Sequence, residues 1–529
     1  MSIIDLLRPK AETRIIHDSD YRGSSHHYGS GRPKYGNIKY QSAGWTDYTQ
    51  QRENSRGVYS DSLIARGIAG RLVDNVINTG LTRECSPLWA EIPEWKNRDE
   101  EEKYQHTEHT ENLFTLYTKS TEADYRGRLT FNQIQRLLFL LKITEGEYFC
   151  ILKYLNPVGR TSPLAIQVLN NDQIQQPYDG TIIKAIEARG NTVEEGIEYD
   201  FAGKMAAIYV REDLNNLDKP LVRIPVKGSK SGRRFIIHDA NFETPEQFRG
   251  VPEFSSSVYE LDSLSEYDIN ELEATVAGSL WFAAIETEKG AIPKGPRIRP
   301  NGNAFNAGEV NEINEGLSEV RIGSKALLMQ NLGAGQTFKG FQPNRPNPNF
   351  AAFEEVFENR IAGSVGMPLS VYRQKFQSSY SAARAEILFF WNNVIRRRDD
   401  FAAGFLNPFF EAWFSEHVRA GNINAPGYNT LPVSHQAWLY GTWNGISRPV
   451  VDPVKEVNAV KLRLELGHTT GEREAKAYNG SDFRENIKRL KTENVMRADA
   501  NLPVNPELAP DDSKENQDGT DTEDSEDDD

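Results

Sequence analysis

The stretch "VYELDSLSEYDINELEATVAGSLWFAAIET", residues 258–287, decides how this chain can fold. It contains no proline, and an uninterrupted α-helix of this length would extend about 45 Å at 1.5 Å per residue. Such a helix is longer than an ordinary globular helix, and a single chain has little further surface to cover its apolar side chains. The stretch therefore predicts a long helix whose apolar residues are covered by neighbouring copies of the chain.

The residues that follow this helix predict a small β-containing tip. Residues 290–348 are rich in Gly, Pro and Asn, and they contain two strand-like pieces, "SKALLMQ" at 324–330 and "QTFKGF" at 336–341. A helical pattern then resumes in "FAAFEEVFENRIAGSVGMP" and is broken at Pro368. A long helix, an insert and a returning helix together predict a stalk with a tip.

The residues before the stalk predict an α+β body. The segment "TFNQIQRLLFLLKITEGEYFCILKYL" is typical of a buried helix followed by a strand, with the break at Gly146. The segment "GNTVEEGIEYDFAGKMAAIYV" alternates as a hairpin does and has a turn residue at Gly203. A further helix is predicted from about residue 63, with Gly80 at its end.

The residues after Pro368 predict a polar loop and then mainly helices. The piece "RQKFQSS", 373–379, lacks hydrophobic periodicity and predicts a mobile loop. From Ala383 onward, apolar residues at helical spacing predict one buried face, with Arg396 to Arg398 mainly off it. Near the C-terminus, Pro453 suits a first helical position, and "TTGE" at 469–472 predicts a capping box. The residues predicted on the buried face are Ile387, Leu388, Trp391, Val394, Ile395, Phe401, Ala402 and Phe405.

The composition predicts an intracellular protein with roughly two to four domains. The chain has 529 residues and two cysteines, Cys85 and Cys150, which form no CxxC pair and so indicate neither a zinc nor a redox motif. Its first residues lack a cleavable leader pattern, and the apolar run at 137–143 is too short to cross a bilayer. We therefore expect no membrane partner.

The charge is concentrated at the C-terminus. Residues 511–529 hold eleven acidic residues and one lysine, so they carry −10 of the net −15 and leave −5 for the other 510 residues. Such a segment cannot bury enough apolar surface to fold, and we expect 509–529 to be a disordered acidic tail. A solubilising role is the simpler interpretation, and an electrostatic lure for a basic partner is the alternative.

The N-terminus has a different bias. Residues 21–57 interleave Tyr, Gly and Ser with six Arg or Lys residues against two acidic ones. That mixture could stack on bases and neutralise phosphates, or it could lie as an extended arm across a neighbouring subunit. We favour a flexible arm over residues 1–57, because nothing in it predicts independent folding.

Motifs for catalysis are missing from the sequence. There is no phosphate-binding loop, no H-E-x-x-H, no G-x-S-x-G and no Gly-rich dinucleotide fingerprint. Acidic pairs such as Glu354 with Glu355, or Asp399 with Asp400, would point about 100° apart on a helix and could not converge on one metal ion. We therefore predict no catalytic residue, no metal site and no cofactor.

Several separated segments, in this order, resemble the lambda-type family of tailed-phage portal proteins over roughly residues 60–496. The most specific are "SYSAARAE" at 379–386 and "DPVKEVNA" at 452–459. The others include "GIEYDFAGKMAAIYV" and the 258–287 stretch itself. The resemblance implies a virion protein that assembles in the host cytoplasm into a ring, typically of twelve subunits, at one vertex of the phage head. Double-stranded DNA would pass through this ring without sequence preference during packaging and ejection.

The resemblance also implies a division of the chain and a set of partners. Partners would be the large terminase subunit, a head-completion or adaptor protein, the major capsid protein and scaffold. The implied parts are a wing at 58–257 with a wing helix at 385–430, stem helices at 258–289 and 349–367, a clip at 290–348, a tunnel loop at 368–384 and a helical crown at 431–508.

Within the implied tunnel loop, five polar side chains are the candidates to face DNA: Arg373, Gln374, Lys375, Gln377 and Ser378. Lys375 stands where the family pattern has an acidic residue. Arg373 and Lys375 repeated around a ring would form a modest basic belt, or would form salt bridges between subunits. Two other classes remain as alternatives: a nucleic-acid enzyme such as a nuclease or packaging motor subunit, and a capsid or scaffold protein that never contacts DNA.

Overall fold

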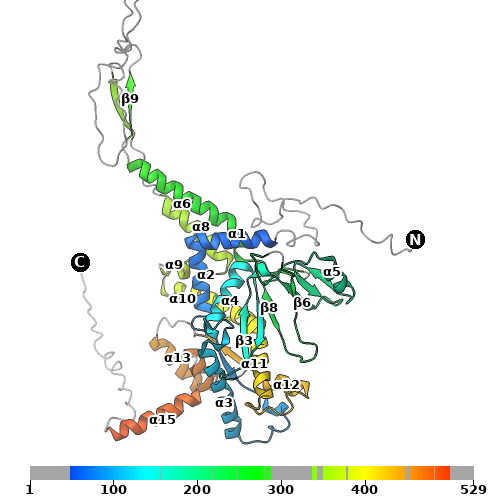
Figure 1. Cartoon of the computed structure of the whole chain (residues 1–529). Coiled ribbons are helices and arrows are strands. Elements are labelled where there is room, and N and C mark those ends of the chain that lie inside the picture. Colours follow the sequence, from blue (N-terminus) through cyan, green and yellow to red (C-terminus); the bar gives the residue numbers. More distant parts are fainter. Residues whose placement is uncertain are drawn as a thin grey trace, which may run out of the picture. The chain divides into compact units, whose positions relative to one another are not determined.

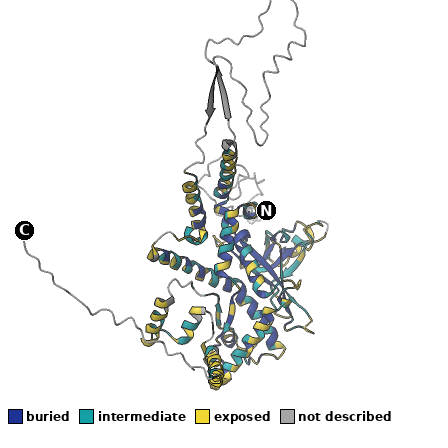
Figure 2. Ribbon diagram, turned by 90° about the vertical axis from the view of Figure 1, so that its left-hand side faces the viewer, coloured by how far each residue is buried: buried dark blue, intermediate teal, exposed yellow. Residues whose placement is uncertain are grey.

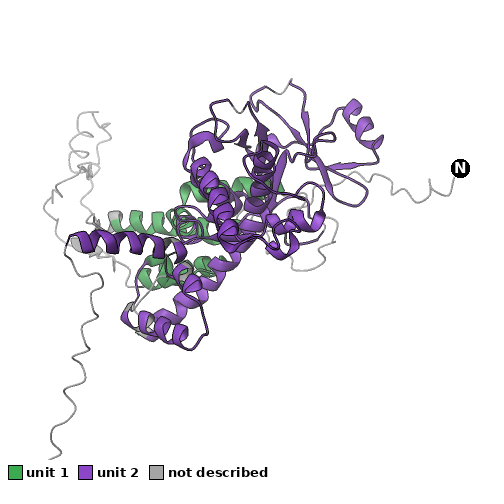
Figure 3. Cartoon of the chain, turned by 90° about the horizontal axis from the view of Figure 1, so that it is seen from below, with its two compact units in different colours: residues 1–68, 254–373 green, residues 69–253, 374–529 purple. Residues whose placement is uncertain are grey.

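The computed structural model of the chain divides into two compact units (Figure 3). Unit 1 comprises residues 1–68 and 254–373, and unit 2 comprises residues 69–253 and 374–529. The residues described are 48–156, 158–216, 219–245, 247–279, 282–287, 336–341, 349–376, 379–446, 448, 453–479, 481 and 483–500. Residues 1–47 of the arm predicted over 1–57 lie outside them, as does the acidic tail. Residues 48–57 belong to helix α1 (Tyr48–Asp61), which buries Tyr48, Gln51, Arg52 and Ser55, so the predicted arm extends too far.

Unit 1 is built around two long antiparallel helices (Figure 1). Ser257 and Ser364 are hydrogen-bonded at 2.8 Å near one end, and Tyr267 packs on Phe353 with ring centroids 4.5 Å apart farther along. This pairing fixes the two helices in opposite directions. The elements of unit 1 are α1 (Tyr48–Asp61), the start of α2 (Leu63–Val76), α6 (Val258–Ser279), β9 (Phe282–Thr287), β10 (Gln336–Phe341), α8 (Phe350–Ser364) and α9 (Leu369–Arg373).

The predicted helix over 258–289 is shorter than expected. It ends at Ser279, and Phe282–Thr287 forms strand β9, which pairs antiparallel with β10. Gly278 and Ser279 are weak helix formers, whereas "FAAIET" at 282–287 contains the strand formers Phe, Ile and Thr. The strand predicted at 336–341 is confirmed as β10, while "SKALLMQ" lies outside the described residues.

Unit 2 contains three antiparallel sheets, with strand orders β3-β2-β8, β4-β5-β6-β7 and β1-β11. This mixture of helices and sheets confirms the predicted α+β class. The strands are β1 (Thr82–Cys85), β2 (Glu147–Tyr154), β3 (Leu164–Val168), β4 (Thr192–Glu194), β5 (Ile197–Tyr199), β6 (Met205–Val210), β7 (Val222–Pro225), β8 (Ile236–Ala240) and β11 (Gly441–Asn444).

The helices of unit 2 cover these sheets and then continue into a separate helical segment (Figure 1). No helix among the described residues is both long and apolar enough to cross a bilayer. The helices are α3 (Glu100–Lys119), α4 (Phe131–Glu145), α5 (Gly180–Glu187), α10 (Tyr380–Phe401), α11 (Asn407–Arg419), α12 (Pro432–Trp438), α13 (Pro453–Glu465), α14 (Gly471–Asn479) and α15 (Phe483–Asp499), with short turns η3 (Trp89–Glu91), η4 (Thr121–Ala123), η5 (Asn171–Gln173), η6 (Glu253–Ser256) and η7 (Ala402–Leu406).

The helix–strand unit predicted around Gly146 is confirmed. Thr130 and Gln133 form a capping box at the start of α4. Gly146 ends the helix with a φ of 81°, and a Cβ there would lie 2.4 Å from the Val251 carbonyl carbon. Only glycine fits both the left-handed conformation and this close approach. The hairpin turn at Gly203 is confirmed as well, between β5 and β6.

The predicted wing helix at 385–430 needs correction. The helix begins earlier, at Tyr380, passes through the π-helical turn η7, and ends at Arg419. In this turn Gly404 lies against Asp239, whose carboxyl carbon would be 2.3 Å from an added Cβ. Asp239 is itself held by Lys142 and by the Tyr148 hydroxyl, each at 2.8 Å.

The buried face of α10 also differs from the prediction. Val394 and Phe401 are buried as expected, but Leu388 and Ile395 are exposed, and Trp391 is only half-buried. Phe390 takes a buried place that periodicity alone did not assign. Beyond α10, the core of unit 2 is a continuous aromatic cluster of Phe114, Tyr117, Phe131, Phe401, Phe405, Phe409, Phe410 and Trp413.

The segment predicted as the crown, 431–508, begins with two elements that contact the sheet-containing body. Strand β11 pairs with β1, and the Ser434 hydroxyl of α12 donates to the Glu91 carbonyl of η3. The helices expected over 453–496 are present as α13, α14 and α15, and Gly467 has the expected positive φ of 70°. The capping box predicted at 469–472 is wrong: α14 begins at Gly471, the Thr470 hydroxyl accepts from the Arg473 N–H, and an arginine at that position cannot accept the hydrogen bond that completes a capping box.

Candidate functional site in the segment between α8 and α10

The candidate segment joins α8 to α10 and spans the boundary between the two units. Met367 is buried, and Pro368 starts α9 because its carbonyl accepts hydrogen bonds from the N–H groups of Val371 and Tyr372 at 3.1 Å. Gln374 then adopts a φ of 53°, which stops the helix. The predicted loop over 368–384 therefore includes a one-turn helix and the first turn of α10.

Arg373 is tied to the stalk by two carboxylates of α8. Its guanidinium donates to Glu358, and Glu355 lies 3.5 Å from a second nitrogen. Burial raises the pKa of Glu358, although the bond from Arg373 opposes this effect. The Arg373 side chain is 30% exposed and the Glu358 side chain is 8% exposed, so this ion pair is partly shielded from solvent. Arg373 is thus engaged inside unit 1.

The next residues carry the exposed part of the segment. Gln374, Lys375 and Phe376 are all exposed. Among the described residues Lys375 forms no ion pair or hydrogen bond, so its ammonium is available to a ligand. Gln377 and Ser378 lie outside the described residues, and their predicted role remains a prediction.

The three arginines of α10 have separate roles that the sequence did not reveal. Arg397 donates to both oxygens of Glu253 at 2.5 and 2.8 Å. Arg398 donates to the carbonyls of Asn75, Val76 and Ile446, and burial lowers its pKa to about 10. Only Arg396 is exposed, with Asp400 at 3.7 Å. Two of the three arginines are therefore structural, and their partners are too distant in sequence for periodicity to indicate.

The α6–α8 pair leaves apolar side chains in solvent. Ile269 and Leu272 on α6 are 58% and 66% exposed, and Val356 on α8 is 56% exposed. On the inner side, burial and the nearby Glu354 carboxylate raise the pKa of Asp268. A helix pair with exposed apolar residues on both members has more apolar surface than it can cover by itself.

The acidic pairs noted in the sequence do not form a metal site. Throughout the described part of the chain, no three His, Cys, Asp or Glu side chains converge as ion ligands. Cys85 and Cys150 are both free and buried, and burial raises the pKa of the Cys85 thiol to about 12.

Known proteins resemble this chain over most of its length. A family model described as "Phage portal protein, lambda family" matches residues 39–398. Portal protein B of Escherichia phage lambda is 24% identical over 394 residues, 72% of this chain and 71% of that protein. The portal protein of Escherichia phage N15 is 24% identical over 281 residues, 51% of this chain and 52% of that protein. A solved chain from "Neck of empty GTA particle computed with C6 symmetry" aligns with 90% of this chain and 96% of its own length, with a TM-score of 0.45 at 13% identity.

The class of protein defined by these matches is the phage portal protein, as the sequence motifs predicted. Because the family model covers more than half of its residues, this chain belongs to the lambda family of phage portal proteins. This family membership favours the portal over the two alternatives, a nucleic-acid enzyme and a capsid or scaffold protein without DNA contact.

Proposed function

We propose that copies of this chain assemble into a ring, typically of twelve subunits, at one vertex of a phage head, and that double-stranded DNA passes through it during packaging and ejection. The supporting observation is the set of apolar side chains exposed on α6 and α8, namely Ile269, Leu272 and Val356. Neighbouring copies in a ring would cover them, as a symmetric assembly requires of a repeated surface.

The parts of the chain take the roles that the resemblance implies. The sheets of unit 2 with α10 and α11 form the wing, α6 and α8 form the stem, and the β9–β10 hairpin begins the clip. The segment around α9 forms the tunnel loop, and α13 to α15 form the crown. The stem helix is assigned to 258–279 and the start of the crown to Pro453, in accordance with the observed elements.

Lys375 is the principal candidate to face DNA within the ring. It is exposed, lacks a described partner and follows the turn at Gln374. Gln374, Gln377 and Ser378 would add neutral polar contacts, whereas Arg373 stabilises the loop through Glu358. Duplex DNA carries a charge about every 1.7 Å of its axis, so few cations per subunit would permit sliding rather than clamping.

The partners follow from the same role. The clip would dock the large terminase subunit during packaging and a head-completion or adaptor protein afterwards. The outer body would contact the major capsid protein and scaffold while the particle assembles in the host cytoplasm. Hydrolysis of ATP belongs to the motor, and this chain contributes no catalytic residue of its own.

Electron microscopy of the purified protein tests this proposal. We expect rings with a central hole, together with neither nuclease nor DNA-stimulated ATPase activity. Particles that remain monomeric at every salt concentration would contradict the ring. Measurable nuclease or DNA-stimulated ATPase activity would favour a nucleic-acid enzyme instead.

A further inference from the structure

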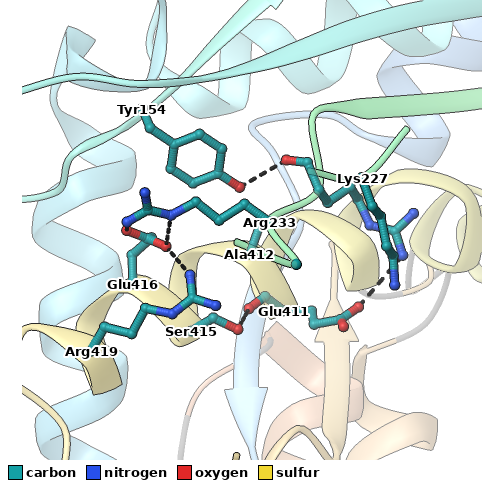
Figure 4. A pocket seen from close by; sticks show the side chains of 10 residues that line it. Tyr154, Lys227, Arg233, Glu411, Ala412, Ser415, Glu416 and Arg419 are labelled. Atoms are coloured by element: carbon teal, nitrogen blue, oxygen red, sulfur yellow. Dashed lines mark hydrogen bonds and ion pairs between the residues drawn. The ribbon is translucent and has the colours of Figure 1, made fainter. Parts of the chain in front are cut away.

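A basic pocket lies in the body of unit 2, formed by the loop between β7 and β8, by Tyr154 at the end of β2, and by α11 (Figure 4). Four basic side chains line it, and only two acidic ones, Glu411 and Glu416, accompany them. The formal charge of the lining is therefore +4 − 2 = +2. The basic residues are Lys227, Arg233, Arg234 and Arg419.

The floor of the pocket is fixed by internal ion pairs. Arg233 donates to both carboxylate oxygens of the buried Glu416, at 2.8 and 2.7 Å, and Arg419 approaches the same carboxylate (Figure 4). The Arg233 guanidinium also lies over the Tyr154 ring, 4.8 Å from its centroid. Both arginines thus bind the Glu416 carboxylate within the protein, and neither Glu416 nor Arg233 is available to a ligand.

The other basic side chains at this pocket have few interaction partners. Among the described residues Lys227 has no hydrogen bond or ion pair, and it is exposed. Within the described part of the chain, the Arg234 guanidinium faces Glu411 at 3.7 Å, which is beyond hydrogen-bonding distance. Lys230 is exposed in the same loop but does not line the pocket. Lys227 and Arg234 therefore point to a site for an anionic ligand.

The loop that carries them is held in place by its backbone. The Gly228 N–H donates to the Arg233 carbonyl at 2.8 Å, and Gly232, with a φ of 65°, donates back to Gly228 at 2.9 Å. Residues Lys227 and Arg234 form a β-bridge at the base of the loop. Because the loop is ordered before binding, a ligand would lose little free energy in ordering it.

We propose that this pocket binds an acidic peptide and that its occupant is the C-terminal segment 511–529 of this chain. That segment carries eleven acidic residues against one lysine, so its charge complements the pocket. Ten residues, 501–510, join Ala500 to this segment and can span up to about 35 Å. A tethered ligand also has an effective concentration in roughly the millimolar range, so modest contacts suffice.

A peptide fits this pocket better than duplex DNA does. Carboxylates on separate side chains can each reach one cation and can form paired bonds with Arg234. The phosphates of a duplex are held in a continuous line, and some would be placed against Glu411, whose nearest arginine lies 3.7 Å away. This carboxylate disfavours a continuous polyanion more than a flexible acidic segment.

The test uses a fluorescent peptide of residues 511–529 and protein that ends at residue 510. We expect the peptide to bind the truncated protein at about 0.05 M salt, to bind the full-length protein more weakly because the native segment competes, and to be released at about 0.5 M salt. A peptide with Asn and Gln in place of Asp and Glu should not bind. Fluorescence anisotropy measures each affinity.

Variants of the truncated protein locate the site. Lys227→Glu with Arg234→Glu should weaken peptide binding at least about tenfold. A milder variant, Lys227→Gln with Lys230→Gln, changes two exposed residues and should weaken peptide binding about threefold. It controls for misfolding of the first variant. The matched control, Lys461→Glu with Lys491→Glu on α13 and α15, changes the net charge equally and should leave binding within about twofold.

Three outcomes would overturn the proposal. The first is unchanged binding in both variants of the pocket. The second is loss of binding in the Lys461 and Lys491 control, which would place the peptide elsewhere. The third is displacement of the peptide by a short DNA duplex at lower concentration than by unlabelled peptide, which would make the pocket a nucleic-acid site.

Discussion

The body of unit 2 and the α6–α8 pair of unit 1 differ in how completely each buries its own apolar side chains (Figure 2). The body buries its aromatic residues around Trp413 and pairs its buried charges, such as Glu198 with Arg223 and Arg189. The α6–α8 pair buries Leu261 and Leu264 but leaves Ile269, Leu272 and Val356 in solvent. The body buries its apolar side chains within one chain, whereas those of the helix pair would be covered by further copies in the proposed ring.

The largest loss of stability is expected from a substitution in the core of the body. Trp413 is fully buried and packs on Phe114, Phe410 and His417, so Trp413→Ala should lower the free energy of unfolding by about 3–5 kcal/mol. Trp391→Ala is the matched control, and it should cost clearly less because Trp391 is half-exposed. Denaturant titration measures both, and equal losses would show that the core is wrongly placed.

The buried carboxylate of Glu198, on β5, should make the body less stable at low pH. Burial alone would raise the pKa of Glu198, but bonds from Arg223, Asn191, Tyr209 and Arg189 outweigh it and lower that pKa to about 2. A depressed pKa stabilises the fold above the unfolded value near 4.5, and this contribution, on the order of 3 kcal/mol, is lost as the pH falls through about 2.

The matching experiment compares wild type with Glu198→Gln across the acid range. The difference between their free energies of unfolding should be largest above about pH 5 and should shrink steadily toward pH 2. A difference that does not change with pH would show that the Glu198 carboxylate is not stabilised by its partners.

Two neighbouring arginines of α10, one paired with a carboxylate and one exposed to solvent, allow the stability contributions of the two kinds of charge to be compared. Arg397→Ala leaves Glu253 without its bidentate partner and should cost about 1–3 kcal/mol of unfolding free energy. Arg396→Ala removes an exposed cation and should change this free energy by less than about 0.5 kcal/mol. Thermal or denaturant unfolding checks the pair, and a reversed order would contradict the contacts of α10.

The smallest expected effect on stability belongs to Lys375. Lys375→Ala should leave unfolding within about 0.5 kcal/mol of wild type and leave assembly intact, because the side chain is exposed. In a phage that carries the variant, the amount or retention of packaged DNA should change. Normal packaging and retention would remove Lys375 from the proposed DNA contact.

Local signals made part of this structure predictable. Gly146 marked the junction of α4 and β2 because a glycine between an apolar helix and an apolar strand has few other uses. Pro453 and Gly467 bounded α13 for the same kind of reason. In the candidate segment, Lys375 is exposed, and its contact with DNA remains a prediction.

Contacts between distant parts of the chain were not predictable in this way. The end of α6 depends on β10, whose residues begin some fifty positions later and pair with Phe282–Thr287. Arg373 was predicted to face DNA or to pair between subunits, and Arg397 to lie mainly off the buried face, but Glu358 and Glu253 engage them within the chain. Such pairs arise from tertiary packing, which single-residue patterns do not encode.

Thiol labelling tests most directly whether the exposed face of α6 is covered in an assembly. The chain has two cysteines, both buried, and burial raises the pKa of Cys85 and Cys150, so neither should compete for a maleimide. Leu272→Cys places a thiol on α6, and Phe201→Cys, at a position 95% exposed in the β5–β6 hairpin, is the control. We expect Leu272→Cys to react at least about tenfold more slowly in assembled particles than in dissociated subunits, while Phe201→Cys reacts equally in both. Equal reactivity of the Leu272→Cys thiol in both states would contradict the proposed ring interface.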